Sequence, residues 1–256
     1  MARPRYPQTQ GPLPPPLPPE TRTVGQLVAE TLRFYGEHFW PSLALGLAVA
    51  AIDQATLGFS VDAQTAILWA GGLLLTASYV AAARLQRGSP APLGAAFVAG
   101  LLVFLPAPIL FRLYVLPVLL WFALVGLAVP AAVSERLGVR AALRRGARLA
   151  AADYVHAIGS IVTLAVVYVL TRAILVLLLH SQGDATKRGA VFLADLALSP
   201  LLFLGPALLY VDQAARIRSG TRPRSRDADV HHALNADAAG APDPQREPRP
   251  AARSQP

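Results

Sequence analysis

The stretch ERLGVRAALRRGARLAAADYVHAIGSIVTLAVVYVLTRAILVLLL, Glu135–Leu179, joins two contrasting kinds of sequence. Its first part places arginines at intervals of four residues, whereas its second part, Val155–Leu179, carries a single charged side chain, Arg172. An α-helix rises about 1.5 Å per residue, so roughly 20 apolar residues are enough to cross about 30 Å of hydrocarbon. The stretch therefore predicts a basic segment at a membrane surface that leads directly into a transmembrane helix.

The rest of the chain has the composition of a membrane protein. Its 256 residues are 54% hydrophobic and only 15% charged, with a mean hydropathy of +0.44, which is too apolar for an ordinary soluble domain. Six apolar segments approach membrane-spanning length: Pro41–Phe59, Ala63–Ala83, Pro92–Leu110, Val115–Val133, Val155–Leu179 and Ala190–Tyr210. We expect an all-α integral membrane protein with about six transmembrane helices, kinked near Pro106, Pro108 and Pro117.

Two polar tails flank the predicted membrane domain, which covers residues 23–220. Residues 1–22 contain the run PLPPPLPP, which is typical of an extended polyproline segment. They lack the apolar core of a signal peptide, so we expect the first span to be uncleaved. Residues 221–256 include one Leu, one Val and no aromatic residue. Neither tail can bury enough apolar surface to offset the entropy of ordering, so both are predicted to be disordered.

Basic residues are distributed unevenly between the two sides that six spans would create. Fourteen arginines lie beside the N-terminal approach, the second and fourth loops and the C-terminal exit. The opposite side has three basic residues, Arg112, Lys187 and Arg188. Cytoplasmic loops carry an excess of Lys and Arg, so both termini are predicted to be cytoplasmic. The abundance of Ala, Arg, Pro and Gly is typical of a GC-rich bacterial genome, so we expect a bacterial cell membrane.

The arginines of the opening stretch occupy one half of a helical wheel: Arg136, Arg140, Arg144, Arg145 and Arg148. Val139, Leu143 and Leu149 fall on the other half, so the segment is amphipathic. Such a helix can rest in the membrane interface, where each guanidinium among anionic lipid headgroups contributes about 1 kcal/mol. No aromatic or amide side chain lies between Arg136 and Arg148 to read bases, so no nucleic-acid partner is expected. Enforcement of topology alone explains these arginines equally well.

A second amphipathic helix is predicted to precede the first span. In residues 24–39 the apolar side chains gather on one face, with Gln26, Glu30 and Glu37 on the other. An offset of 115 residues aligns this helix with the basic one, placing Val24 on Val139 and Phe39 on Tyr154. The alignment suggests two related units, each an interfacial helix followed by membrane helices.

Three segments resemble a known family: TVGQLVAETLRFYGEHFWP, then VPAAVSERLGVRAALRRGARLAAADY, then LSPLLFLGPALLYVDQAARIRSG. They are similar to the membrane domain attached to some bacterial glycerophosphoryl diester phosphodiesterases, a family that also includes stand-alone membrane proteins. The resemblance covers Thr23–Gly220 and is most specific at Pro130, Glu135, ALRRGARL and LLYVD. It implies a helical membrane domain without catalysis, because the enzymes carry a separate catalytic barrel of about 250 residues and only a polar tail follows the last predicted span here.

No set of residues with the spacing of a catalytic, metal-binding or cofactor motif is present, and the chain has no cysteine. We therefore expect a non-enzymatic protein without a cofactor. The informative ionisable residues lie inside predicted spans: Asp53, Arg172 and Asp195. Each costs about 2.5–3.5 kcal/mol at the centre of a transmembrane helix, so isolated ones are rare.

Arg172 and Asp195 lie at similar depth on the two arms of one predicted hairpin, so they are placed to pair. Such a pair can serve helix packing or can line a polar cavity. Two functions remain open. The first is a membrane protein that organises or binds lipid or a partner at the cytoplasmic leaflet. The second is a small transporter with a polar site between helices, which would need the charges to face a common cavity.

Overall fold

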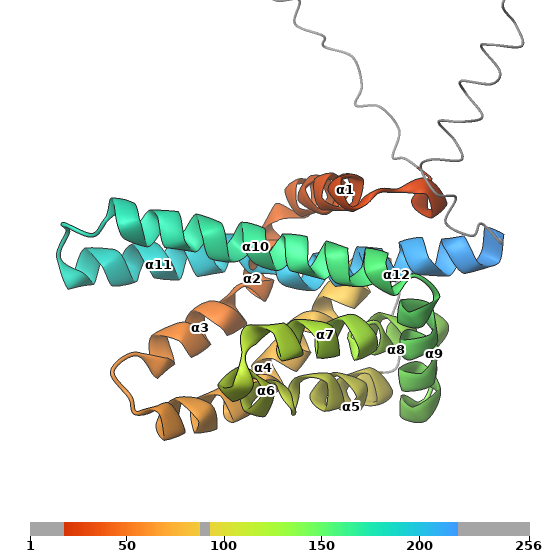
Figure 1. Cartoon of the computed structure of the whole chain (residues 1–256), viewed down its shortest axis with the longest axis horizontal. Coiled ribbons are helices and arrows are strands. Elements are labelled where there is room, and N and C mark those ends of the chain that lie inside the picture. The colour runs from red at the N-terminus through yellow and green to blue at the C-terminus, as the bar shows by residue number, and fades with distance from the viewer. Residues whose placement is uncertain (1–17, 88–92, 220–256) are drawn as a thin grey trace, which may run out of the picture. The chain divides into compact units, whose positions relative to one another are not determined.

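The computed structural model describes residues 18–87 and 93–219, and every regular element in these ranges is a helix (Figure 1). The predicted all-α class is confirmed. The predicted tail 221–256 and most of the predicted tail 1–22 lie outside the described residues. At the end of that tail, Pro19–Thr21 form a short 3-10 helix, η1, against α12 (Pro200–Ser219), and Arg22 is buried.

Five helical segments among the described residues are long and apolar enough to cross a membrane: Val61–Arg87, Leu93–Leu113, Val115–Glu135, Tyr154–Leu178 and Asp184–Ser219. They correspond to the second to sixth predicted spans. The first predicted span, Pro41–Phe59, is instead divided into α2 (Phe39–Leu45) and α3 (Leu47–Thr56). The structure thus supports a membrane protein with several spanning helices, but not the count of six.

Most of the membrane-length segments are interrupted helices. Only α4 (Val61–Arg87) and α10 (Tyr154–Leu178) run without a break. The other segments are made of successive pieces: α5 (Leu93–Phe104) with α6 (Ala107–Leu113), α7 (Val115–Val125) with α8 (Ala128–Glu135), and α11 (Asp184–Leu198) with α12. Of the three prolines, Pro106 lies at the break between α5 and α6, whereas Pro108 and Pro117 lie in the first turns of α6 and α7. The hairpin turns at the extended residue Tyr114.

The break at Gly46 explains why the first predicted span is not one helix. A Cβ at this position would lie 2.1 Å from the carbonyl oxygen of Leu196 in α11. The backbones of α2–α3 and α11 therefore approach closely near the interruption of each helical segment. The Ser199 hydroxyl donates to the Gly46 carbonyl at 3.5 Å. Hydropathy cannot show this interruption, because the residues around Gly46 are as apolar as those of an unbroken span.

The break between α7 and α8 is satisfied by a buried tyrosine. Tyr79 of α4 is fully buried, and its Oη donates to the Gly126 carbonyl at 2.9 Å. A carbonyl freed from its helix inside a membrane needs such an internal partner. The ring of Tyr79 also contacts those of Phe104, Phe122 and Phe203. This aromatic cluster joins α4, α5, α7 and α12 and forms the centre of the core.

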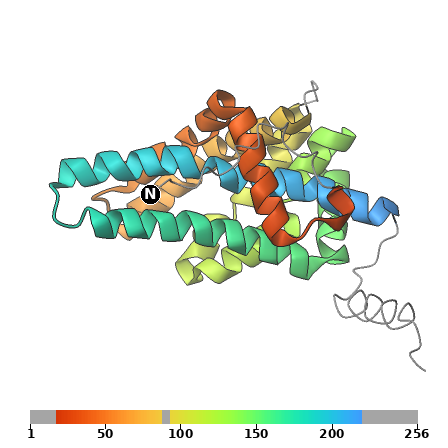
Figure 2. The same ribbon diagram turned by 90° about the horizontal axis from the view of Figure 1, so that it is seen from above.

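The two amphipathic helices, α1 (Val24–Glu37) and α9 (Val139–Ala152), cross the others. Figure 2 shows α1 lying over α10 and α12, and Figure 1 shows α9 running across one end of the bundle. Both turn their apolar faces to protein, since Leu27 of α1 and Leu149 of α9 are fully buried in one shared cluster. The apolar face of α9 therefore packs against protein, and the location of its arginine face in the membrane interface stays a prediction. Sequence alone cannot distinguish an apolar face that meets lipid from one that meets protein.

The offset of 115 residues recurs in the helix boundaries. α1 and α9 are both 14 residues long and begin at Val24 and Val139. Each is joined to the next helix by one non-helical residue of similar conformation, His38 (φ −121°, ψ 44°) and Asp153 (φ −145°, ψ 71°). The units differ afterwards, because α2 and α3 are separate and α10 is continuous.

The close packing of α9 on α8 requires a glycine at position 146. Replacing Gly146 by Ala would place a Cβ 2.5 Å from the Ala128 nitrogen, a backbone atom that cannot move aside as a side chain would. We expect Gly146→Ala to destabilise the protein by about 1–3 kcal/mol, as overpacking does. The measurement is thermal unfolding of the detergent-solubilised protein followed by tryptophan fluorescence. Gly72→Ala in α4 is the control, since a Cβ there meets nothing within 4 Å; equal midpoints for the two variants would contradict this close packing.

Candidate functional site

The predicted basic set divides into two groups in the structure. Arg140, Arg144 and Arg148 are exposed on the outward side of α9. Arg136 is exposed too, but it precedes α9 and caps the end of α8 in the left-handed conformation, with φ 54°. It cannot be part of the predicted helix because the chain must turn between a membrane-length helix and a crosswise one. Arg145 is half-buried, and its side chain contacts Glu135.

Arg145 belongs to a polar network at the α9 end of the bundle, where α4 and α12 also end. Its Nε donates to Oε1 of Glu135 at 2.9 Å, and the Tyr210 hydroxyl donates to the same oxygen at 2.7 Å. These three residues border a cavity of about 440 Å³, which we call the basic pocket. Its lining residues come from α4, α8, α9 and α12 and are Gln86, Arg87, Ser134, Glu135, Arg145, Tyr210, Val211, Ala214 and Arg218.

The sequence prediction identified only Arg145 among the cationic residues of the basic pocket. The predicted topology places Arg87 in the second loop and Arg218 in the C-terminal exit, and nothing in their spacing relates them to α9. One signal does exist in the sequence. The resemblance was most specific at Glu135, in the ALRRGARL run and at LLYVD, and these segments supply Glu135, Arg145 and Tyr210 of the same network.

A second charge network at the α9 end binds the segment before α1 to the bundle. Arg22 is buried and donates to the fully buried Asp212 of α12 at 2.9 Å. Arg216, also on α12, pairs with Asp153 at 2.6 Å and donates to the Arg22 carbonyl. Asp153 also caps the start of α10 by accepting from the His156 nitrogen. The network joins η1, α10 and α12, and its charges are used within the protein.

The three intramembrane charges predicted from the sequence lie together. Arg172 of α10 pairs with Asp53 of α3 at 2.6 Å and with Asp195 of α11 at 3.3 Å. Tyr168, one turn before Arg172, donates to Asp195 at 2.7 Å and accepts from Arg172 at 3.3 Å. The contact between Arg172 and Asp195 was expected. The contributions of Asp53 and Tyr168 were not, because α3 is distant in sequence from the hairpin of α10 and α11.

This charge cluster is dominated by interactions within the protein. Asp195 is fully buried, and the side chains of Arg172 and Asp53 keep 30% and 20% of their exposure. One guanidinium faces two carboxylates, and Oδ2 of each Asp lacks a hydrogen-bond partner among the described residues. In an apolar environment such groups are retained only with their partners, since an unpaired buried charge is costly. The cluster therefore holds α3, α10 and α11 in register.

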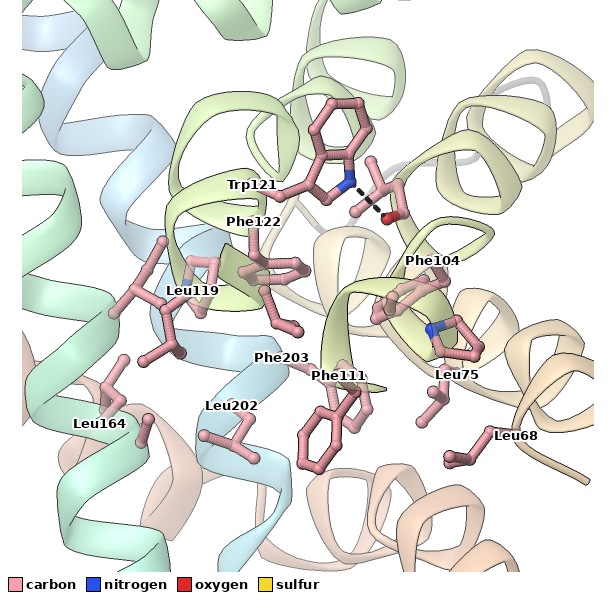
Figure 3. A pocket seen from close by; sticks show the side chains of 17 residues that line it. Leu68, Leu75, Phe104, Phe111, Leu119, Trp121, Phe122, Leu164, Leu202 and Phe203 are labelled. Atoms are coloured by element: carbon pink, nitrogen blue, oxygen red, sulfur yellow. Dashed lines mark hydrogen bonds between the residues drawn. The ribbon is translucent and has the colours of Figure 1, made fainter. Parts of the chain in front are cut away.

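An apolar cavity of about 330 Å³ lies elsewhere in the bundle (Figure 3). The rings of Phe104, Phe111 and Phe203 surround it, and the Trp121 Nε1 donates to the Val103 carbonyl at 2.9 Å beside it. None of its 17 lining residues is charged, and none belongs to the charge cluster. The predicted intramembrane charges thus do not face this cavity, as a polar transport site in it would require.

Metal binding finds no support in the part of the chain that the structure describes. No group of three or more His, Asp or Glu side chains in residues 18–87 and 93–219 could hold a metal ion. The charge cluster has two carboxylates, and both already face a guanidinium.

Loss of Arg172 should destabilise the protein more than loss of either partner. Arg172→Leu leaves two carboxylates without a cation, whereas Asp195→Asn leaves the pair of Arg172 with Asp53. Breaking a fully buried pair costs about 3–5 kcal/mol, and less is expected here because Arg172 is partly exposed. Arg172→Leu should lower the thermal midpoint and the yield of folded protein. Adding Asp53→Asn and Asp195→Asn to Arg172→Leu should restore much of both, because no unpaired charge then remains.

The matched control is Arg112→Leu, which removes an arginine from an exposed pair with Asp62 at 2.6 Å and should change little. If Arg172→Leu and Arg112→Leu unfold at the same temperature as the unchanged protein, the charge cluster does not stabilise the packing of α3, α10 and α11.

Comparisons with known proteins add no name to this geometry. No protein-family model, curated protein or solved structure matches the chain. The resemblance to the phosphodiesterase membrane domain therefore stays a prediction.

Proposed function

We propose that this chain is a non-enzymatic, multi-pass protein of a bacterial cell membrane that binds anionic lipid headgroups at the cytoplasmic leaflet through its α9 end. One observation carries the proposal: Arg140, Arg144 and Arg148 are exposed on the outward side of a helix that runs across the end of the bundle. Their guanidinium groups can meet headgroup phosphates without leaving an internal partner, because no ion pair within the described residues involves them.

The distribution of basic residues supports the proposed orientation. Most of the basic residues near the helices belong to the α9 end, including those of α9, Arg87 and Arg218. At the opposite ends of the helices, the described residues include three basic side chains, Arg112, Lys187 and Arg188. The excess of basic residues favours a cytoplasmic α9 end. Arg22 pairs with Asp212 of α12, and α12 ends on the same side at Ser219, so this orientation favours cytoplasmic termini.

The apolar surface is consistent with lipid contact along the helices. Large hydrophobic side chains are exposed along α10, among them Val169, Leu170 and Leu177. Trp40, at the start of α2, is 76% exposed, and aromatic residues of this kind are enriched at membrane interfaces. Membership of the phosphodiesterase membrane-domain family is part of the proposal and implies no activity.

A small transporter is the second candidate, and the charge cluster is the observation that favours it. Asp53 and Asp195 each present an oxygen without a partner in the described residues, and such sites serve ions in some transporters. The lipid-binding function is preferred because the charges of the cluster are paired with one another, and no residue of the cluster lines the apolar cavity.

Reporter fusions test the orientation. A reporter enzyme active only outside the cytoplasm should show no activity when fused after Gly220, because both termini are expected inside. The same reporter fused after Gly183, between α10 and α11, should be active. Activity after Gly220 would overturn the orientation and, with it, the assignment of α9 to the cytoplasmic leaflet.

Titration of the full-length, detergent-solubilised protein with short-chain fluorescent lipids tests the binding. The protein should bind phosphatidylglycerol more tightly than phosphatidylcholine, and the difference should shrink as salt rises. Replacing Arg140, Arg144 and Arg148 by Gln should weaken phosphatidylglycerol binding by up to about 100-fold, at about 1 kcal/mol per arginine.

The matched control replaces Arg112, Lys187 and Arg188 by Gln. It also removes three positive charges, but from the opposite ends of the helices. Equal losses for the two triple variants would show that net charge, and not the α9 surface, determines binding.

A further inference from the structure

The basic pocket differs chemically from the exposed side of α9. Three guanidinium groups from three helices, those of Arg87, Arg145 and Arg218, border one cavity with a single carboxylate, Glu135. The formal charge of this set is +2, from three arginines and one glutamate. The exposed arginines of α9 lie along one helix instead and do not line this pocket.

Much of the hydrogen-bonding capacity of these arginines is not used within the protein. Arg145 uses Nε for Glu135, and Arg218 uses Nε for the Ala214 carbonyl at 3.2 Å. The described residues provide no further hydrogen bond or ion pair for the terminal nitrogens of either, and none for Arg87. Free donors on arginines that line one cavity are suited to an oxyanion, because the planar guanidinium binds two oxygens of a phosphate at once.

The remaining lining groups fit the same kind of ligand. Gln86 and Ser134 border the pocket with an amide and a hydroxyl, both able to donate to a phosphate oxygen. Glu135 holds Arg145 and Tyr210 in place through its Oε1. The volume of about 440 Å³ lies within the range of small-molecule sites and leaves room for the first atoms beyond a phosphate.

We propose that the basic pocket binds a phosphomonoester group, carried either by a membrane lipid or by a soluble phosphate ester. The charge decides between phosphate types. A phosphomonoester carries about −1.5 to −2 at neutral pH, which balances the pocket's charge of +2, whereas a phosphodiester carries only about −1. This inference rests on the proposed function and names the ligand chemistry of one site at the α9 end.

Two double variants with the same change of charge test the pocket. Arg87→Gln with Arg218→Gln removes two pocket arginines that are in no ion pair within the described residues, so the fold should be kept. Arg140→Gln with Arg144→Gln removes two exposed arginines of α9. Each full-length variant is titrated in detergent with short-chain phosphatidic acid, a phosphomonoester, and phosphatidylglycerol, a phosphodiester.

The unchanged protein should prefer phosphatidic acid. The pocket variant should lose that preference, with binding of phosphatidic acid weakened on the order of tenfold more than binding of phosphatidylglycerol. The α9 variant should weaken both lipids equally and keep the preference. If the pocket variant also keeps it, the pocket is not the site and the inference fails, while the proposed function still stands on the α9 variant. If neither lipid binds the unchanged protein, the proposed function fails together with the inference.

Inorganic phosphate distinguishes the two sources of the group. Displacement of phosphatidic acid by inorganic phosphate, in the unchanged protein but not in the pocket variant, identifies a site that recognises the phosphate alone and can take a soluble ester. Preference for phosphatidic acid that survives excess inorganic phosphate identifies a site for the lipid-borne group. Either result supports the pocket, provided that the preference disappears when Arg87 and Arg218 are replaced.

Discussion

The carbonyl oxygen of Leu196 lies 2.1 Å from the place that a Cβ at position 46 would take, so only glycine lets α11 and the α2–α3 junction approach this closely. The contact lies near two interruptions in the helices, Gly46 between α2 and α3 and Ser199 between α11 and α12. It brings α3 alongside α11. As a result Asp53 comes within reach of Arg172, which also holds Asp195. One close backbone contact thus determines both the division of the first hydrophobic segment and the composition of the charge cluster.

A glycine also permits a close approach of two helices at the α9 end of the bundle. Gly146 lets α9 pack closely against the backbone of Ala128. The apolar face of α9 packs against α7, α8 and α12 rather than against lipid. This burial separates the arginines of α9 by role. Those on the outward side remain available to a surface, while Arg145 is drawn into the network of Glu135 and Tyr210. A helix that floated in the interface by itself would keep all its arginines equivalent.

Charge is handled differently in the two halves of the molecule. Inside the bundle, Arg172 is enclosed by two carboxylates and a tyrosine, so its charge is compensated where the dielectric constant is low. At the α9 end, Arg22 and Arg216 are likewise paired with Asp212 and Asp153, and they serve to attach η1 to α12. Most of the described arginines that are in no ion pair lie on the outward side of α9 or at the basic pocket, although Arg188 at the start of α11 is a further one. This division separates charges that maintain the fold from charges that are able to meet an anionic ligand.

Sequence alone determined the all-α class, the membrane-length segments from Ala63 onward and the short list of intramembrane charges, because hydrophobic length and the cost of buried charge act locally along the chain. It also determined the amphipathic character of residues 24–39 and 136–148. Only the tertiary structure decided that Gly46 interrupts the first segment, that Arg136 ends α8, and that the apolar face of α9 meets protein. It alone joined Arg87, Arg145 and Arg218 around one pocket. These features depend on contacts between helices distant in sequence, and hydropathy and helical periodicity carry no information about which surfaces meet.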